Sequence, residues 1–372
     1  MKARAAVLKG FRQPYELQEF PIPEIAPGAI LIKITMANIC GSDLHIWRGD
    51  LATKIPPEGI IIGHETTGRV AKLGPGVKTD SLGNPLKEGD RVVYCYFNPC
   101  GSCYQCLHGH RAACPRKMSN MAGSIKDPPY LRGGFAEYCY LQPGMFVFKT
   151  PDALSDELVA PVNCALSQVI YGLSQAGVRF GDTVVIQGAG GLGLNAIAVA
   201  REMGAGKIIA IDSVASRLEL AKEFGADDTI DLNKAPTPEA RIERVMELTR
   251  KRGADVVCEL VGLPAVIAEG IAMLRSGGTY LEVGNISRGQ TVAFDPSALT
   301  WGNKKIAGVL MYDPWVIPKA LDFLERTRAR YPFERMLSHK FPFAKINDAF
   351  AQAEWLDRQK DVSITRASLV ME

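Results

Sequence analysis

The chain has 372 residues, of which 47% are hydrophobic and 22% charged, and 43 basic against 40 acidic residues give a net charge of +3. This length predicts two domains, and a charge so near neutrality argues against nucleic acid or a membrane surface as a partner. The residues after Met1 do not resemble a secretory leader, and no apolar run reaches membrane-spanning length, so we expect a cytoplasmic protein.

Residues 1–158 alternate short apolar runs with turns rich in glycine and proline. Strands are expected at 29–34 and 90–96. This pattern indicates an all-β domain whose functional residues lie on long loops. The stretches 43–62 and 78–87 look like such loops and could shape a pocket or an interface.

Two segments of this first domain are dense in metal-ligand residues, one beginning at Cys40 and the other containing His64. A catalytic zinc needs three protein ligands and one open position. The best third ligand is Cys164, which lies where the two predicted domains would meet. The alternatives are a buried core cysteine for Cys164 and a hydrogen-bonded structural histidine for His64. Three further cysteines in strand-like surroundings are expected to be core residues: Cys95, Cys139 and Cys258.

Four cysteines share one window with the spacing Cys-x-x-Cys-x-x-Cys-x7-Cys: Cys100, Cys103, Cys106 and Cys114. Thiolates this close in sequence form the closed tetrahedral shell of a structural zinc, with no open position for substrate. An iron–sulfur cluster is the sharpest alternative, although its fourth cysteine normally follows after three residues or lies far away. A disulfide framework suits shorter secreted chains, a nucleic-acid zinc finger needs Cys/His pairs, and thiols without metal are the remaining alternative.

From about residue 159 the pattern changes to strands that alternate with helices. Strands are expected at 183–187, 207–212, 229–232, 255–260 and 279–283, and helices at 158–177, 196–200, 217–224, 239–252 and after Pro264. Such alternation predicts a parallel sheet covered by helices on both faces.

The first of these strands runs into a glycine-rich turn that opens a helix. Gly188 would allow the tight turn, Gly190 the close approach of a pyrophosphate, and Gly193 the packing of helix on strand. Free N–H groups at the helix start suit phosphates. Asp212 ends the next strand, where its carboxylate can bind the adenosine ribose and repel a 2′-phosphate, which favours NAD over NADP. Arg217 nearby could instead bind that phosphate. The alternative for the glycine-rich segment is a turn with a purely structural role.

The last stretch, from about residue 309, shows one strand-like segment and amphipathic helices near 318–328 and 346–356. We expect it to return to the first domain.

Several motifs, in this order, make the chain resemble the zinc-dependent medium-chain alcohol dehydrogenase family. They are Gly63-His64-Glu65, the four-cysteine window, Gly-Gly-Phe-Ala-Glu-Tyr at 133–138, the glycine turn and Asp212. The match covers nearly the whole chain. It implies an α/β fold with a GroES-like, β-rich catalytic domain and a doubly wound Rossmann coenzyme domain. The implied boundaries are 1–158 for the catalytic domain, with a structural zinc lobe at 95–118, then 159–308 for the NAD-binding domain and 309–372 for the returning segment.

Carried over position by position, the resemblance implies that Cys40, His64 and Cys164 bind the catalytic zinc. Polyol and threonine dehydrogenases of the family use a glutamate where this chain has Ala160, so the cysteine-type shell is favoured. Glu65 matches an alternative or transient zinc ligand. The resemblance also implies roles for residues near these ligands: Ser42 bonds the substrate oxygen, His45 passes its proton outward, Asp43 orients His64, and Trp47 and Tyr96 line the substrate pocket. The implied cofactor contacts are Gly188, Gly190, Gly191, Leu192, Gly193, Asp212, Arg217, Gln168 and Val283.

The implied function is reversible hydride transfer between NAD and an alcohol, expected to be secondary and apolar or cyclic, with two zinc ions per subunit, one catalytic and one structural. A small-molecule alcohol or ketone is the expected partner. The short 117–132 segment resembles that of bacterial tetrameric relatives and favours a homotetramer over a dimer. The alternatives are a zinc-free quinone or enoyl reductase of the same superfamily and a non-catalytic nucleotide-binding scaffold.

Overall fold

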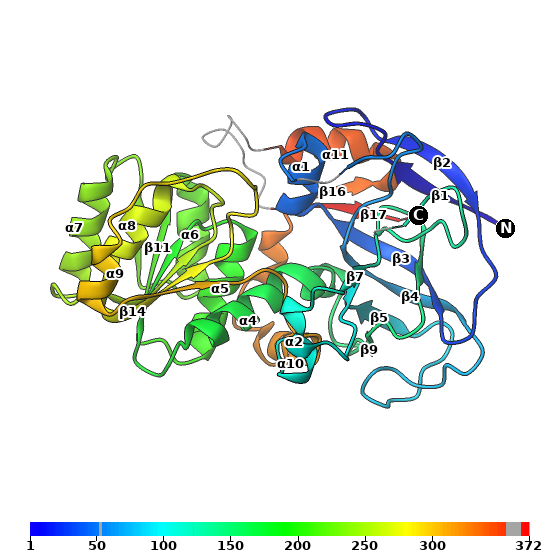
Figure 1. Cartoon of the computed structure of the whole chain (residues 1–372), viewed down its shortest axis with the longest axis horizontal. Coiled ribbons are helices and arrows are strands. Elements are labelled where there is room, and N and C mark those ends of the chain that lie inside the picture. The colour runs from blue at the N-terminus through cyan, green and yellow to red at the C-terminus, as the bar shows by residue number, and fades with distance from the viewer. Residues whose placement is uncertain (52–53, 122, 355–365, 372) are drawn as a thin grey trace.

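The computed structural model describes residues 1–51, 54–121, 123–354 and 366–371. Two lobes lie side by side (Figure 1), with the blue N-terminal strands and the red C-terminal strand together in the right-hand lobe and the green-to-yellow middle of the chain in the left-hand lobe. Among the described residues, no helix combines the length and apolarity that crossing a bilayer requires.

The left-hand lobe is built on a six-stranded, all-parallel sheet in the order β12-β11-β10-β13-β14-β15. Its strands are β10 (Thr183–Gln187), β11 (Lys207–Asp212), β12 (Asp228–Asp231), β13 (Ala254–Glu259), β14 (Leu274–Glu282) and β15 (Lys305–Gly308). The central strands β10 and β13 are buried along their whole length, as expected for a parallel sheet covered on both faces. The prediction of a doubly wound Rossmann sheet is confirmed, and its strand order reverses between β10 and β13, where such sheets bind ligands.

Helices cover both faces of this sheet. Their bounds are α4 (Ser167–Ala176), α5 (Gly191–Glu202), α6 (Ala215–Glu223), α7 (Pro238–Leu248), α8 (Ala265–Met273) and α9 (Ser297–Gly302). Apolar side chains of α4, α5 and α6 share one core cluster with the sheet, whereas those of α7 and α8 form a second cluster on the opposite face.

The right-hand lobe is a β domain whose main sheet has the order β16-β17-β3-β4-β5-β9, with β8 also paired to β3. The bounds are β3 (Ile30–Asn38), β4 (Glu65–Leu73), β5 (Arg91–Tyr94), β8 (Tyr138–Leu141), β9 (Val147–Lys149), β16 (His339–Pro342) and β17 (Ala367–Val370). Two small antiparallel pairs flank it: β1 (Lys2–Val7) with β2 (Glu16–Pro21), and β6 (Phe97–Asn98) with β7 (Met118–Ser119). The expected β-rich domain is confirmed.

The loop predicted at 43–62 is wrong at its start, because α1 (Gly41–Arg48) is a helix. Its first turn is capped by Asp43, whose Oδ2 accepts the backbone N–H of Cys40 at 3.0 Å. Its end is Gly49 with φ +86°, a left-handed conformation that glycine adopts without strain. Both signals were present in the sequence as an acid early in the helix and a glycine after it.

The helix predicted at 158–177 is interrupted. The chain forms α3 (Asp156–Val159), a single π-helical turn over Val162–Leu166, and then α4. Pro161 lacks an N–H, so the helical ladder cannot continue through it, and the extra residue is absorbed as a π turn. This irregular turn carries Cys164.

The C-terminal segment holds two strands, β16 and β17, where the sequence indicated one. With α11 (Ile346–Ala353) they complete the right-hand sheet, since β17 pairs with β3. By contrast, α10 (Val316–Thr327) packs on α4 and the π turn, within the core cluster of the left-hand lobe. The segment therefore contributes to both lobes and ties them together.

Candidate active site

Cys40, His64 and Cys164 converge between the two lobes, with their ligand atoms all within 4.8 Å of one another. The Sγ atoms of the two cysteines lie 3.9 Å apart. Cys40 stands at the start of α1, His64 directly precedes β4, and Cys164 lies on the π turn. Cys/His/Cys is a donor set that suits a tetrahedral zinc with one open position, so these residues fit the expected ion.

Asn163 fixes the π turn that carries Cys164. Its Nδ2 donates to the backbone oxygens of Thr66 at 3.3 Å and Tyr94 at 3.0 Å, and its own carbonyl accepts from the Tyr312 hydroxyl. The turn is thereby held to strands of the catalytic domain. Asn163 was not predicted from the sequence, because its partners are far away in sequence.

The imidazole of His64 is oriented from both sides. Nδ1 lies 3.2 Å from Asp43 Oδ1, and Nε2 lies 3.3 Å from Ser42 Oγ. A carboxylate partner calls for hydrogen on Nδ1 and leaves the Nε2 lone pair for a metal. Burial alone would lower the pKa of His64, but Asp43 and then Cys40 raise it well above its usual value.

The two ligand thiols differ in acidity. The pKa of Cys40 lies well below its ordinary value, first because Cys164 hydrogen-bonds its thiolate and then, against burial, because His64 does so too. The pKa of Cys164 is raised by that same contact and by burial. Cys40 is therefore the first of the pair to become a thiolate, the form that binds metals.

Glu65 lies behind this trio, fully buried. Its Oε2 pairs with Arg366 and accepts from Asn38 Nδ2 at 3.3 Å, whereas Oε1 has no hydrogen-bond partner among the described residues. Burial raises the pKa of Glu65 to about 7, although Arg366 opposes the shift. A β-carbon added to Gly191 would lie 2.7 Å from Arg366 Nη2, so this guanidinium joins the Glu65 carboxylate to the start of α5. Arg366 was not predicted from the sequence, since an arginine before an apolar strand is not a distinctive pattern.

His45 lies on α1 and contacts the opposite lobe. Its Nδ1 is 2.9 Å from Asp50 Oδ2, 3.1 Å from Arg48 Nη2 and 3.2 Å from Ser287 Oγ, which belongs to the loop after β14. Burial and Arg48 lower the pKa of His45, while Asp50 partly offsets them.

The two predicted pocket residues lie in different surroundings. The Tyr96 ring lies against the His64 ring, with centroids 4.8 Å apart. Trp47 instead packs near Phe350, with ring centroids 6.5 Å apart, and its Nε1 donates to the Gln13 carbonyl at 2.8 Å. Tyr96 therefore borders the proposed ligands, whereas Trp47 supports the outer side of α1.

The glycine turn has the geometry of a phosphate cradle. Gly188 has φ +94°, and a β-carbon on Gly193 would lie 1.9 Å from the Gly188 carbonyl oxygen, so only glycine fits either position. A β-carbon on Gly190 would project into open space at the start of α5. Backbone N–H groups there are accessible to a pyrophosphate, so the residues present fit a dinucleotide.

Asp212 lies beside this turn at the end of β11. Its Oδ2 accepts from the Ala189 N–H at 2.8 Å and its Oδ1 from the Val214 N–H at 2.9 Å. Arg217 Nη1 is 3.9 Å from Oδ2. The remaining expected cofactor contacts lie on different elements of the coenzyme domain, with Leu192 on α5, Gln168 on α4 and Val283 directly after β14.

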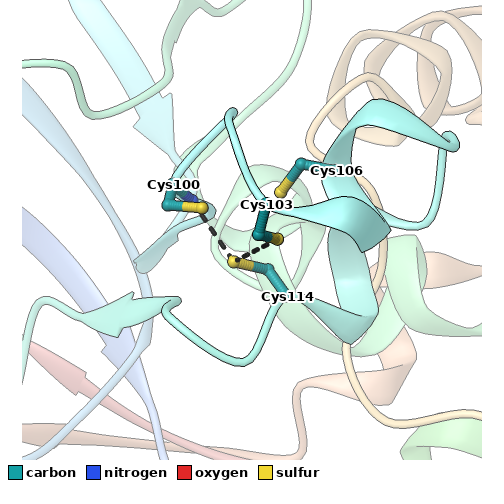
Figure 2. Close-up of side chains that lie close together, drawn as sticks. All are labelled: Cys100, Cys103, Cys106 and Cys114. Atoms are coloured by element: carbon teal, nitrogen blue, oxygen red, sulfur yellow. Dashed lines mark hydrogen bonds between the residues drawn. The ribbon is translucent and has the colours of Figure 1, made fainter.

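The four cysteines of the window converge in a separate lobe, with their sulfur atoms within 4.8 Å of one another. Figure 2 shows the side chains pointing toward one shared centre, with Cys114 linked to the Cys100 N–H at 3.4 Å and to Cys103 Sγ at 3.7 Å. A hydrogen bond from the backbone N–H of Ser102 contributes most to lowering the pKa of Cys100 to about 6. Four sulfur ligands fit a closed zinc shell.

Comparisons with known proteins agree with this architecture. Residues 26–152 match the model of the alcohol dehydrogenase GroES-like domain, and 191–326 match that of zinc-binding dehydrogenases. The chain is 36% identical over 348 residues to 5-exo-hydroxycamphor dehydrogenase of Pseudomonas putida, covering 93% of this chain and 94% of that one. It is 32% identical to Bacillus subtilis sorbitol dehydrogenase, with coverage of 86% and 85%. The fold superposes on an alcohol dehydrogenase of Thermotoga maritima with a TM-score of 0.92, at 31% identity and full coverage of both chains.

Proposed function

This chain belongs to the zinc-dependent medium-chain alcohol dehydrogenase family and is an alcohol oxidoreductase, and from that premise we propose that it transfers hydride reversibly between a secondary, apolar or cyclic alcohol and NAD. The observation that carries this proposal is the convergence of Cys40, His64 and Cys164 at the lobe junction. These residues would hold a catalytic zinc and leave one position for the substrate oxygen.

When bound, zinc would supply a Lewis acid that favours loss of the alcohol proton, and NAD would accept the hydride. The chain's own residues move that proton. Ser42, 3.3 Å from His64 Nε2, offers a hydroxyl at the site that can accept it and pass it toward His45. Asp43 keeps His64 in the tautomer that binds a metal. Glu65 remains behind the ligands, where Arg366 balances its charge.

The cofactor would be held at the carboxyl ends of the parallel strands. The start of α5 presents N–H groups to the pyrophosphate, and Arg366 adds a cation beside Gly191. The Asp212 carboxylate, already oriented by two backbone N–H groups, would receive the ribose hydroxyls and repel a 2′-phosphate. These features support NAD over NADP.

A second zinc would occupy the four-cysteine lobe and serve structure alone, because four thiolates fill its shell. The lobe is fastened to the rest of the molecule by Asp313, whose Oδ1 accepts the Ala112 N–H at 2.7 Å. The proposed stoichiometry is therefore two zinc ions per subunit. None of the nine cysteines forms a disulfide, which also suits the reducing cytoplasm.

The substrate proposal rests on Tyr96, which brings an aromatic ring to the edge of the ligand trio. A ring of this kind favours an apolar or cyclic alcohol over a polyol. The similarity to a hydroxycamphor dehydrogenase, whose name denotes a cyclic alcohol, points the same way.

We further propose a homo-oligomer, with a tetramer favoured over a dimer. β15 is the last strand of the coenzyme sheet, and large apolar side chains are exposed near it: Trp301, Ile306 and Leu310. An open edge flanked by such residues is suited to pairing with a second copy.

The proposal is tested by comparing the wild type with Cys40→Ala. Oxidation of cyclohexanol, 2-butanol, benzyl alcohol and sorbitol is followed by the absorbance of NADH, and zinc is counted by mass spectrometry. We expect the wild type to contain two zinc ions and to favour cyclohexanol. Cys40→Ala should keep one zinc ion and bind NADH normally, yet lose turnover by at least about 1000-fold, since it removes a ligand of the reacting centre.

A matched control is Cys258→Ala, which removes a buried thiol of β13 that belongs to neither candidate metal group. It should retain both zinc ions and its turnover. Unchanged turnover in Cys40→Ala would refute a zinc mechanism and favour a zinc-free reductase, and iron in place of zinc would refute the structural site.

A further inference from the structure

The end of α1 places the carboxylate of Asp50 next to the imidazole ring of His45. Gly49 adopts the left-handed conformation, and the N–H groups of Gly49 and Asp50 both donate to the His45 carbonyl, at 3.1 and 2.9 Å. This closing turn folds the chain back on itself. The Asp50 side chain consequently reaches its own helix, where Oδ2 lies 2.9 Å from His45 Nδ1.

Arg48 holds that acid in place. Its side chain is only 1% exposed, its Nε donates to Asp50 Oδ2 at 2.7 Å, and its Nη1 donates to Glu354 Oε1 at 2.8 Å. Because the guanidinium of Arg48 is already fixed between two carboxylates, it loses little further conformational entropy when it orients Asp50. The Asp50 side chain remains 28% exposed, so the carboxylate contacts the histidine on one side and solvent on the other.

The contacts of Nδ1 decide which ring nitrogen carries hydrogen. An ionised carboxylate only accepts, so the 2.9 Å contact with Asp50 requires hydrogen on Nδ1. The Ser287 hydroxyl at 3.2 Å can accept from the same N–H, whereas Arg48 Nη2 at 3.1 Å can only donate. The shortest and charge-assisted contact is the one with Asp50, which leaves the lone pair on Nε2.

We propose that Asp50, anchored by Arg48, is a positioning residue that fixes His45 in the Nδ1–H tautomer and turns Nε2 toward the proton released by the alcohol. This inference rests on the proposed function. During oxidation Nε2 accepts one proton, the ring becomes an imidazolium with Asp50 as its counter-ion, and the ring later returns one proton to water. Ser287 adds a contact from the coenzyme lobe, so the position of the His45 ring also depends on how the two lobes pack together.

The charged groups that face His45 set the expected pH behaviour. They are Asp50 and Arg48 near its own ring and Cys40 at the start of its helix, while Ser287 from the other lobe is uncharged. Asp50 favours the protonated ring and Arg48 opposes it. Removing the Asp50 charge should therefore shift the rise of alcohol oxidation with pH, which requires a neutral His45, to lower pH.

The test is a double-mutant cycle of wild type, Asp50→Asn, His45→Gln and the double variant. Cyclohexanol oxidation with NAD is measured from about pH 5 to about pH 10, together with zinc content, NADH binding and thermal midpoint. We expect Asp50→Asn to lower kcat about tenfold or more, to change KM little and to shift the ascending limb. In the His45→Gln background the same substitution should cause no further loss, and Asp50→Glu should restore part of the activity.

Two outcomes would overturn the inference. One is an Asp50→Asn variant with the kcat and pH profile of the wild type. The other is a loss that persists in full in the His45→Gln background, since that loss would not pass through the histidine. A wild type that oxidises none of the four alcohols named under the proposed function would instead refute that function. The Asp50 and His45 variants test only how Asp50 acts on His45.

Discussion

Asp212 helps to build the glycine turn, and we propose that it also sets the preference for NAD over NADP. Its two oxygens accept the N–H groups of Ala189 in the glycine turn and of Val214 in the following loop. The carboxylate therefore stabilises the turn that receives the pyrophosphate. Its negative charge then opposes a 2′-phosphate, and these two effects are separable by substitution.

Asp212→Asn keeps an acceptor oxygen and removes the charge. We expect the ratio of kcat/KM for NAD to that for NADP to fall by about 10- to 100-fold, because close like charges cost on the order of 1–3 kcal/mol. Initial rates with each cofactor measure this ratio. Asp212→Gly removes the acceptor as well and should also weaken NAD binding. A wild type that already prefers NADP would show that Arg217, not Asp212, governs the choice.

Local patterns were sufficient to predict much of the site and not all of it. The cysteine window and the glycine turn carry characteristic spacing, whereas Cys40, His64 and Cys164 were predicted from ligand-rich segments, the expected domain junction and the family resemblance. The structure brings each of these groups together. Asn163 and Arg366 have no such spacing. They act on partners from distant strands, as when Arg366 reaches Glu65, and only the folded chain reveals those pairs.

The helices and strands show the same difference between features that local patterns predict and features that depend on distant partners. β10 and β11 have the predicted bounds because buried parallel strands read as continuous apolar runs. α1 was missed because polar and ligand residues mask its short pattern, although its capping acid and terminal glycine were visible. The π turn at Cys164 follows from Pro161 only once the neighbouring strands are known to hold it.

At the junction of β13 and β14, two acids stand directly opposite each other, Glu259 and Glu282. Glu259 is fully buried and accepts four hydrogen bonds from the loops after both strands: from the N–H groups of Val261, Gly262 and Gly284 and the amide of Asn285. Burial and then the neighbouring Glu282 raise the pKa of Glu259 to about 8. Because the folded-state pKa of Glu259 lies above its ordinary value of 4.5, the contribution of this group to stability is full below about pH 4.5 and is lost as pH rises through about 8.

Glu282→Gln should lessen that loss. Glutamine keeps the oxygen that accepts from Asn285 and replaces a repelling oxygen with an N–H that can donate to Glu259. We expect little change in thermal midpoint near pH 6 and a gain at pH 9 of several degrees, equivalent to about 1–2 kcal/mol. Differential scanning fluorimetry across this range measures it. Glu243→Gln, an exposed change of equal charge on α7, is the control; an equal gain there would contradict the pairing argument.

At the scale of the whole molecule, the lobes share one continuous core, which runs from Phe97 and Phe148 in the catalytic domain to Val184 and Ile186 in the coenzyme sheet. α10 and the π turn lie within it, and Arg366, directly before the last strand, crosses the junction. Burial across this junction restricts how the lobes separate. Large apolar side chains are exposed at the outer edge of the coenzyme sheet, away from this shared core: Trp301, Ile306 and Leu310.

That edge provides the last prediction. Trp301 is 87% exposed and Ile306 is 45% exposed beside β15, to whose outer side no described strand pairs. A second copy could extend the sheet across this edge and bury both side chains, so light scattering should find the wild type as a tetramer or a dimer. Trp301→Glu combined with Ile306→Lys should shift it to smaller species, because charges at a buried strand pair are costly to desolvate. Phe180→Glu, equally exposed but distant in sequence from β15, should leave the assembly intact. A monomeric wild type, or a double variant that assembles like the wild type, would contradict an interface at this edge.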